Sequence, residues 1–202
     1  MTTIAVVGAG NIGATLARKW AAAGHDVTLA SRNPDAPELR ELAASIGART
    51  AGHLDAVSAA EVVLVALPGG AVAAVVEALG TALDGRLVID ATNNVASEEM
   101  DGIAAITRHA PGAISARAFN SVGWESLAEP VFDGMPADLL WCGPDGASGA
   151  LVEQLISDVG LRPVRVGGLD QLALVDMLAR LWFALALGQG RGRHVAFKIL
   201  PG

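Results

Sequence analysis

Short, almost continuous apolar runs alternate with helical stretches along the 202-residue chain. Such runs are typical of strands that are buried on both faces of a parallel sheet. The predicted strands are residues 3–7, 26–30, 62–67, 86–91, 113–118, 137–142 and 161–166, with a short one near 48–51. The predicted helices are 11–23, 36–46, 70–80, 98–108 and 146–159. This alternation predicts an α/β fold with a doubly wound, mostly parallel sheet of about eight strands.

The pattern changes near residue 168. Residues 171–188 contain only three strongly polar members, Gln171, Asp176 and Arg180. A helix that is apolar on nearly every side is usually buried on more than one face, which favours a core helix; a dimer seam or a pocket lid is the alternative. We therefore predict a Rossmann-type sheet domain over 1–167 and a small helical lobe over 168–202.

Composition and charge argue against several classes of partner. The net charge of -7 and pI near 5.0 give no electrostatic footprint for nucleic acid. The longest apolar run that we identify, Val62 to Val76, contains Pro68 and falls short of the roughly 20 residues of a spanning helix, so we expect no membrane segment. A start without a basic leader and a single cysteine, Cys142, favour the cytoplasm.

A glycine-rich turn follows the first predicted strand. The stretch "VVGAGNIGATLA" places Gly8, Gly10 and Gly13 in GxGxxG spacing between a strand and a helix. The first glycine permits a tight turn, the second lets the backbone approach a diphosphate, and the third allows close packing of helix on strand. The diphosphate would meet backbone N–H groups at the positive end of the helix dipole. The turn predicts dinucleotide binding, with Asn11 facing the ligand and capping the helix.

The second predicted strand ends at Ala30 and is followed by Ser31 and Arg32. Enzymes specific for NAD carry an acidic residue near this position, which accepts hydrogen bonds from the ribose 2′-OH. Arginine instead forms paired, charge-assisted hydrogen bonds with a 2′-phosphate, and the serine can add another. The pair therefore predicts a preference for NADPH, with an ordinary surface arginine as the alternative.

Three further strand ends should surround the nicotinamide, because ligands of open α/β sheets bind beyond the carboxyl ends of the strands. These ends are "LPGG" (67–70), "ATNN" (91–94) and "FNSVG" (119–123). Turn chemistry alone could explain their Asn, Ser and Gly residues. The candidates near the nicotinamide are Pro68, Thr92, Asn93, Asn120 and Ser121, and we also expect Ala91 to contact the cofactor.

General acids are scarce. The chain has no Tyr, and its only lysines are Lys19 and Lys198. We interpret His25, His53 and His109 as surface residues, and no His has metal-ligand spacing, so no metal is expected. Carbonyl reduction needs a proton donor beside the hydride, whereas a flavin-like ring needs one less strictly. The composition therefore favours a ring-like hydride acceptor.

Several short motifs carry a family resemblance. The stretches "GAGNIG", "SRN", "AFNSVGW", "CGPD", "LRPV" and "HVAFKIL" together resemble the deazaflavin-dependent NADP reductases. They are also similar to the oxidoreductase domain of the membrane-bound STEAP metalloreductases. The resemblance implies hydride transfer between NADP(H) and coenzyme F-420, an 8-hydroxy-5-deazaflavin, with the two rings stacked in a cleft between the Rossmann part and a small C-terminal lobe. It also implies a homodimer.

The resemblance assigns roles by position. Residues Ala9, Gly10, Asn11 and Ile12 would line the diphosphate, Ser31 and Arg32 the 2′-phosphate, and Leu67 and Pro68 the nicotinamide side. The chain departs from the archaeal reductases at Gly69-Gly70-Ala71, where they carry bulky and ionisable residues, and at Asn120, where they place a His. Arg191, Arg193 and His194 would either meet an anionic acceptor tail or form a solvated basic turn.

Three functional hypotheses remain open from the sequence. The first is an NADPH-dependent oxidoreductase that passes hydride to a deazaflavin or a flavin. The second is an NADPH-dependent reductase of a small imine, enone or quinone in the space left by Gly69 and Gly70. The third is a non-enzymatic NADPH-binding sensor that reports occupancy through residues 171–188.

Overall fold

The computed structural model describes residues 1–200, which fall into two compact units. The first unit is Met1–Ser115 and the second begins at Ala116. This boundary is defined only by the compactness of the two units. The predicted division at residue 167, between an NADP-binding domain and a helical lobe, stays a prediction, and residues 201 and 202 of that lobe lie outside the described residues.

The first unit holds a parallel sheet in the order β5-β4-β1-β2-β3. Its strands are β1 (Thr3–Val7), β2 (Asp26–Ala30), β3 (Arg49–Ala51), β4 (Val62–Val65) and β5 (Leu87–Asp90). Every residue of β4 and β5 is buried, as expected for central strands that helices cover on both faces. Parallel pairing brings the carboxyl ends of all these strands to one edge of the sheet.

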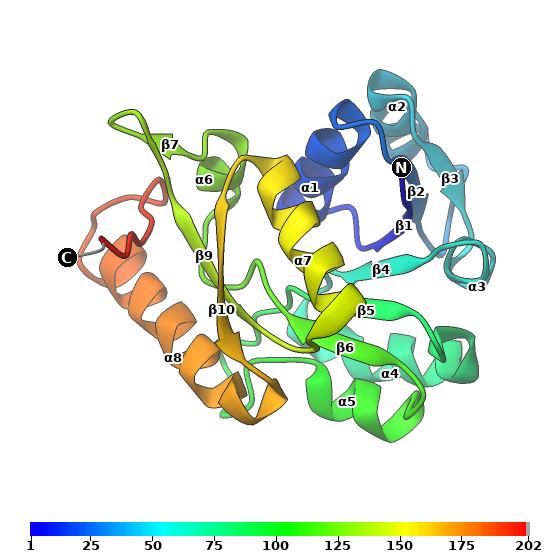
Figure 1. The fold of residues 1–202 in the computed structure, drawn as a ribbon. Coiled ribbons are helices and arrows are strands. Elements are labelled where there is room, and N and C mark those ends of the chain that lie inside the picture. The colour runs from blue at the N-terminus through cyan, green and yellow to red at the C-terminus, as the bar shows by residue number, and fades with distance from the viewer. Residues whose placement is uncertain (201–202) are drawn as a thin grey trace. The chain divides into compact units, whose positions relative to one another are not determined.

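Helices flank this sheet on both faces. They are α1 (Asn11–Ala22), α2 (Pro37–Ile46), α3 (His53–Ser58), α4 (Gly69–Leu79), the 3-10 turn η1 (Gly80–Leu83) and α5 (Ile103–His109). The pair α1 and α2 packs together on one face, and α4 with α5 lies on the other (Figure 1). This is the doubly wound arrangement that the alternating pattern predicts.

The second unit is built on the strand order β10-β9-β6. Its sheet consists of β6 (Ile114–Arg117), within which the unit boundary falls, β9 (Asp138–Cys142) and β10 (Arg162–Gly167), and β7 (Val131–Phe132) pairs with β8 (Met135–Pro136) in a hairpin. The helices are α6 (Trp124–Ala128), α7 (Gly146–Val159), η2 (Leu169–Gln171), α8 (Leu172–Phe183) and the π-helical turn η3 (Ala184–Gly188). Strand β9 is parallel to β10 and antiparallel to β6. The predicted fold class, a Rossmann-type α/β fold with eight mostly parallel strands, is confirmed.

Helix α8 is less buried than we predicted from its apolar sequence. Only one face is buried, through Val175, Ala179 and Trp182, whereas Leu174 and Met177 on the other face are 58 % and 64 % exposed. Within residues 1–200, the stretch Leu169–Gly188 is the one helical segment long and apolar enough to cross a membrane, judged by length and composition only. The expectation that the protein contacts no membrane stays a prediction.

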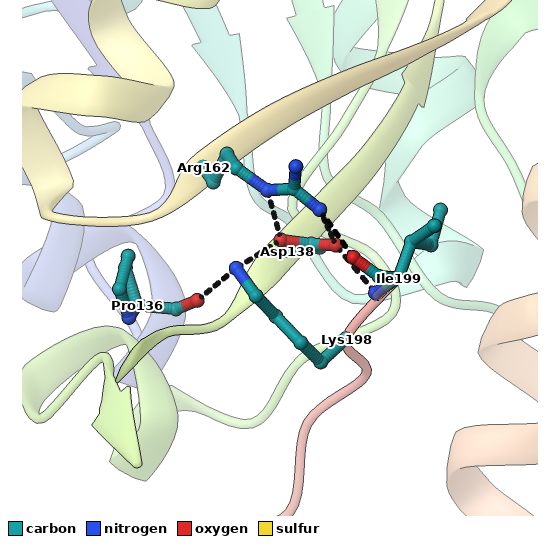
Figure 2. A network of polar contacts seen from close by, with 5 residues as sticks. All are labelled: Pro136, Asp138, Arg162, Lys198 and Ile199. Atoms are coloured by element: carbon teal, nitrogen blue, oxygen red, sulfur yellow. Dashed lines mark hydrogen bonds and ion pairs between the residues drawn. The ribbon is translucent and has the colours of Figure 1, made fainter. Parts of the chain in front are cut away.

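A buried carboxylate ties the C-terminal segment to the second unit. Asp138, the first residue of β9, has no exposed side-chain surface. It accepts hydrogen bonds from Arg162 (Nε, 2.7 Å), from Lys198 (Nζ, 2.9 Å) and from the backbone N–H of Ile199 (2.7 Å), as Figure 2 shows. Lys198 also donates to the carbonyl oxygen of Pro136.

The same contacts set the charge state of Asp138. Burial alone raises the pKa of this carboxyl, but the hydrogen bonds from Arg162, Ile199 and Lys198 outweigh burial. The net result holds the pKa of Asp138 at about 2, compared with an ordinary value of 3.8. The Asp138 carboxylate is therefore ionised at all pH values well above its pKa of about 2.

Candidate functional site

The glycine turn joins β1 to α1 in the first unit. At Gly8, φ is +106°, and a Cβ there would clash with the carbonyl group of Ala66. A Cβ at Gly13 would clash with the carbonyl oxygen of Gly8, whereas one at Gly10 would meet nothing within 4 Å. The first and third glycines are thus required by packing within the protein. The second borders open space, which is what the approach of a diphosphate requires.

The start of α1 differs from our prediction in one respect. Its N-cap is Gly10, in extended conformation and without a side-chain cap hydrogen bond, so Asn11 is the first helical residue and not the cap. The first N–H groups of an α-helix have no partner inside the helix. Those of Asn11, Ile12 and Gly13 are therefore available to an anion at the positive end of the helix dipole.

The residues that follow β2 and β3 lie side by side. Ala30 pairs with Ala51 at the ends of these parallel strands, and the backbone N–H of Ser31 donates to the carbonyl oxygen of Ala51 at 3.0 Å. The N–H of Asn33 donates to the Ser31 hydroxyl at 3.1 Å, which fixes the turn that carries Arg32. The Arg32 side chain is exposed at this edge of the sheet.

A cavity of about 360 Å³ opens at the carboxyl ends of β1, β2 and β4. It brings together six of the residues predicted to bind the cofactor, namely Gly8, Ala9, Ser31, Arg32, Leu67 and Pro68. The other predicted cofactor residues, Gly10, Asn11, Ile12, Gly13 and Ala91, do not line it. The glycine turn and the Ser-Arg pair therefore share one cavity, in which Arg32 is a cation and no carboxylate is present.

His53 also lines this cavity, although sequence reasoning placed it in a surface loop. It is the first residue of α3, a helix of six residues that the hydrophobic pattern did not reveal. Burial and, after it, the positive charge of Arg32 lower the pKa of His53 below its usual value of 6.5. In the free protein the cavity therefore favours the uncharged form of the His53 imidazole.

The loop that follows β5 carries two of the candidates near the nicotinamide, Thr92 and Asn93. Thr92 is buried and Asn93 half-buried. The loop is held by Asp90, a fully buried residue whose carboxylate accepts hydrogen bonds from the N–H groups of Thr92 (3.0 Å) and Gly102 (2.7 Å). Sequence reasoning missed Asp90; the available signal was an acidic residue that ends an otherwise apolar strand.

The two glycines that begin α4 are not equivalent. A Cβ at Gly69 would overlap the side chain of Asn94, whereas one at Gly70 would meet nothing within 4 Å. The space that we expected at both positions is therefore already filled by Asn94 at the first. Pro68 is the N-cap residue of α4 and lies at the wall of the cavity.

Two other candidates, Asn120 and Ser121, lie in the second unit and are buried. The Asn120 amide donates at 3.3 Å both to the carbonyl oxygen of Val175 and to the carboxylate of Asp176. Asp176 in turn pairs at 2.8 Å with Arg117, whose side chain is completely buried. These contacts give Asn120 a structural role, and its contact with the nicotinamide stays a prediction. Sequence reasoning missed Arg117, although a charged residue within the predicted strand "AISARA" was the available signal.

Two basic residues near the C-terminus, Arg193 and His194, have partners within the second unit. The Arg193 guanidinium donates to Glu125 at 2.7 Å, and a ring nitrogen of His194 lies 3.0 Å from the carbonyl oxygen of Glu129. The His194 ring also stacks on Phe132. Of the three residues predicted to meet an acceptor tail, two are therefore already engaged. In the described part of the chain, no three His, Cys, Asp or Glu side chains gather as metal ligands would.

A parallel sheet whose glycine turn opens on a cavity at the strand ends defines a Rossmann-type dinucleotide-binding protein. Residues 3–94 match the family described as NADP oxidoreductase, coenzyme F-420-dependent. The resemblance drawn from the sequence is thus confirmed for these residues, and the match supports an NADP-dependent oxidoreductase. No protein with a curated description matches the chain.

Solved structures share the fold over the whole chain. A candidate F-420-dependent NADP reductase from an Arthrobacter species has 23 % identity and a TM-score of 0.84, with full coverage of both chains. A hypothetical protein from Sinorhizobium meliloti has 28 % identity and a TM-score of 0.72, with coverage of 100 % and 97 %. A reductive aminase from Aspergillus terreus, in complex with NADPH and ethyl-5-oxohexanoate, has 22 % identity and a TM-score of 0.65, with 94 % of this chain covering 65 % of that one.

Proposed function

We propose that the protein is a cytoplasmic NADPH-dependent oxidoreductase that transfers hydride between NADP(H) and a deazaflavin, coenzyme F-420, or a flavin. The observation that carries the proposal is the shared cavity, in which the glycine turn and the Ser31-Arg32 pair face the same space. The family that residues 3–94 match is described as dependent on coenzyme F-420, which supports the deazaflavin as acceptor.

The glycine turn and the residues that line the cavity fit NADPH in three places. The open space beside Gly10 and the first N–H groups of α1 suit the diphosphate. The guanidinium of Arg32 suits the 2′-phosphate, because arginine forms bidentate hydrogen bonds with phosphate. No carboxylate among the described residues lines the cavity to repel the phosphate. Leu67 and Pro68 supply an apolar wall toward the nicotinamide. When bound, NADPH supplies the hydride.

Positioning supplies most of the catalysis in this proposal. None of the candidates near the nicotinamide, Pro68, Thr92, Asn93, Asn120 and Ser121, titrates near neutral pH. Holding two rings in near-attack geometry can lower a barrier by several kcal/mol without an acid or a base. A ring that delocalises charge is therefore a better acceptor for this site than a simple carbonyl.

The test of the acceptor is NADPH oxidation with and without coenzyme F-420 in a stopped-flow instrument, followed at the visible absorbance of the deazaflavin. We expect the deazaflavin to be reduced as NADPH is consumed. Reduction of neither the deazaflavin nor FMN would overturn the proposal. Turnover with a small cyclic imine alone would favour the second candidate, which the open space beside Gly70 and the likeness to a reductive aminase support.

The test of the donor is the variant Arg32→Asp. It should raise the KM for NADPH at least tenfold while it leaves that for NADH nearly unchanged, because only the 2′-phosphate meets the altered charge. Arg108→Asp is the matched control, since Arg108 is an exposed arginine at the end of α5 that does not line the cavity. Equal effects of Arg32→Asp on the two coenzymes would contradict the assignment.

The homodimer implied by the family resemblance is part of the same proposal. The exposed apolar face of α8, which includes Leu174, Met177 and Leu181, offers a surface that a second copy could cover. Light scattering should then report a dimer for the natural chain and a monomer for Met177→Glu. A monomer in both cases would contradict the proposed homodimer.

The remaining alternative is the non-enzymatic NADPH-binding sensor. NADPH binding without turnover of any acceptor would favour it.

A further inference from the structure

We propose that His53 is a second recognition group for the 2′-phosphate, which takes up a proton when NADP(H) binds and then holds the phosphate together with Arg32. This inference rests on the proposed function, because it assumes that the cavity receives NADP(H). It adds a residue that the glycine and Ser-Arg motifs do not contain, and it adds a pH dependence to the choice of coenzyme.

The geometry follows from the pairing of two short strands. Strands β2 and β3 run parallel, with Ala30 opposite Ala51, and the N–H of Ser31 donates to the carbonyl oxygen of Ala51. The chain segments that leave these strands therefore start side by side. His53 stands two residues beyond Ala51 and lines the same cavity as Ser31 and Arg32.

The charges around His53 come from few groups. Arg32 lines the same cavity and acts on His53 through its charge, and Asp55 of the same helix as His53 is exposed. The elements β1 and η1, which pack against α3, carry no ionisable side chain. Strands β2 and β3 contribute Asp26 and Arg49, which pair with each other at 2.8 Å at the amino ends, away from the cavity.

Burial and, after it, the neighbouring guanidinium lower the pKa of His53 and so favour the neutral imidazole in the free protein. A 2′-phosphate carries a charge of about -1.5 to -2 at neutral pH and would reverse the sign of the field at this ring. The proton comes from solvent and binds the free ring nitrogen. Because the complex then holds more protons than the free protein, affinity for NADP(H) rises as pH falls toward the ordinary imidazole pKa of 6.5.

The experiment compares the natural chain with His53→Gln, which keeps a polar side chain of similar reach but cannot take a charge. Calorimetry of NADPH and NADH binding in two buffers with different ionisation enthalpies counts the protons taken up. We expect uptake by the natural chain with NADPH that exceeds uptake by His53→Gln, and no difference between them with NADH. At pH 6.5 the variant should bind NADPH roughly tenfold more weakly, as for one lost charge-assisted hydrogen bond.

The control is His109→Gln, at the last residue of α5, which does not line the cavity and should behave as the natural chain. If NADPH binds more tightly than NADH but His53→Gln leaves proton uptake and affinity unchanged, the role of His53 is wrong and the proposed function stands. If the natural chain binds NADPH no more tightly than NADH, both are overturned. Protonation of the phosphate itself is common to both proteins and cancels in the comparison.

Discussion

The substitution Asp138→Asn should weaken the attachment of the C-terminal segment and reduce stability in a pH-dependent way. The amide keeps the shape of the side chain but loses the charge that pairs with Arg162 and Lys198. The pKa of Asp138 is about 2 in the folded protein, compared with 3.8 ordinarily. At 1.36 kcal/mol per pKa unit, this difference corresponds to about 2 kcal/mol of stability at neutral pH.

That magnitude must be reduced for solvent screening, since the side chains of Arg162 and Lys198 are 43 % and 26 % exposed. We therefore expect Asp138→Asn to cost about 1 to 2 kcal/mol of unfolding free energy at pH 7. Because the folded-state pKa is lowered, the stabilisation is complete above about pH 4 and is lost as pH falls toward 2. The variant does not titrate there, so the gap between the two proteins should shrink by about 1 kcal/mol at pH 3.

Urea unfolding at pH 7 and pH 3, followed by circular dichroism, measures both quantities. The matched control is Asp26→Asn, which breaks the more exposed pair with Arg49 and should cost at most about 1 kcal/mol at pH 7. A stability difference between the natural chain and Asp138→Asn that is equally large at both pH values would refute the reasoning, because the loss would then owe nothing to the charge.

Three further substitutions have distinct expected outcomes. Gly13→Ala should destabilise the protein by about 3 kcal/mol or more in urea unfolding, because the methyl group would clash with the carbonyl oxygen of Gly8. Gly10→Ala should leave the unfolding midpoint nearly unchanged but weaken NADPH binding at least tenfold in a fluorescence titration, since its methyl group enters only open space. Asp176→Asn should cost about 3 kcal/mol, measured in the same way as for Gly13→Ala, because Arg117 would stay buried without its countercharge.

The parts of the fold that local sequence predicts are those with a strong pattern and a marked end. The strands 3–7 and 26–30 agree with β1 and β2 to the residue, because an apolar run stops at a turn in each case. The helix α3 was missed because its six residues bury only Ala56 and Val57, too few for a period to be visible. The burial of α8 was misjudged because composition does not say how much of a face other elements cover.

The residues of the site likewise divide into those that local sequence predicts and those that it does not. The glycines and Arg32 belong to one local pattern, in which each residue is recognised by its distance from a strand. His53 enters the cavity because β3 pairs with β2, and a strand of three residues gives little warning of that pairing. Asp90 and Arg117 act through contacts with residues distant along the chain, which a single sequence does not display.

The buried pair of Arg117 and Asp176 has a consequence for how α8 settles during folding. An apolar helix on an apolar surface has several neighbouring positions of similar free energy, related by a small rotation or by a slide of one turn. In the structure the acid of α8, Asp176, meets the guanidinium of Arg117 and the Asn120 amide, and a rotation or slide of the helix would move this acid away from both. We therefore expect this polar contact to favour one register of α8 over the others that its apolar packing alone would tolerate.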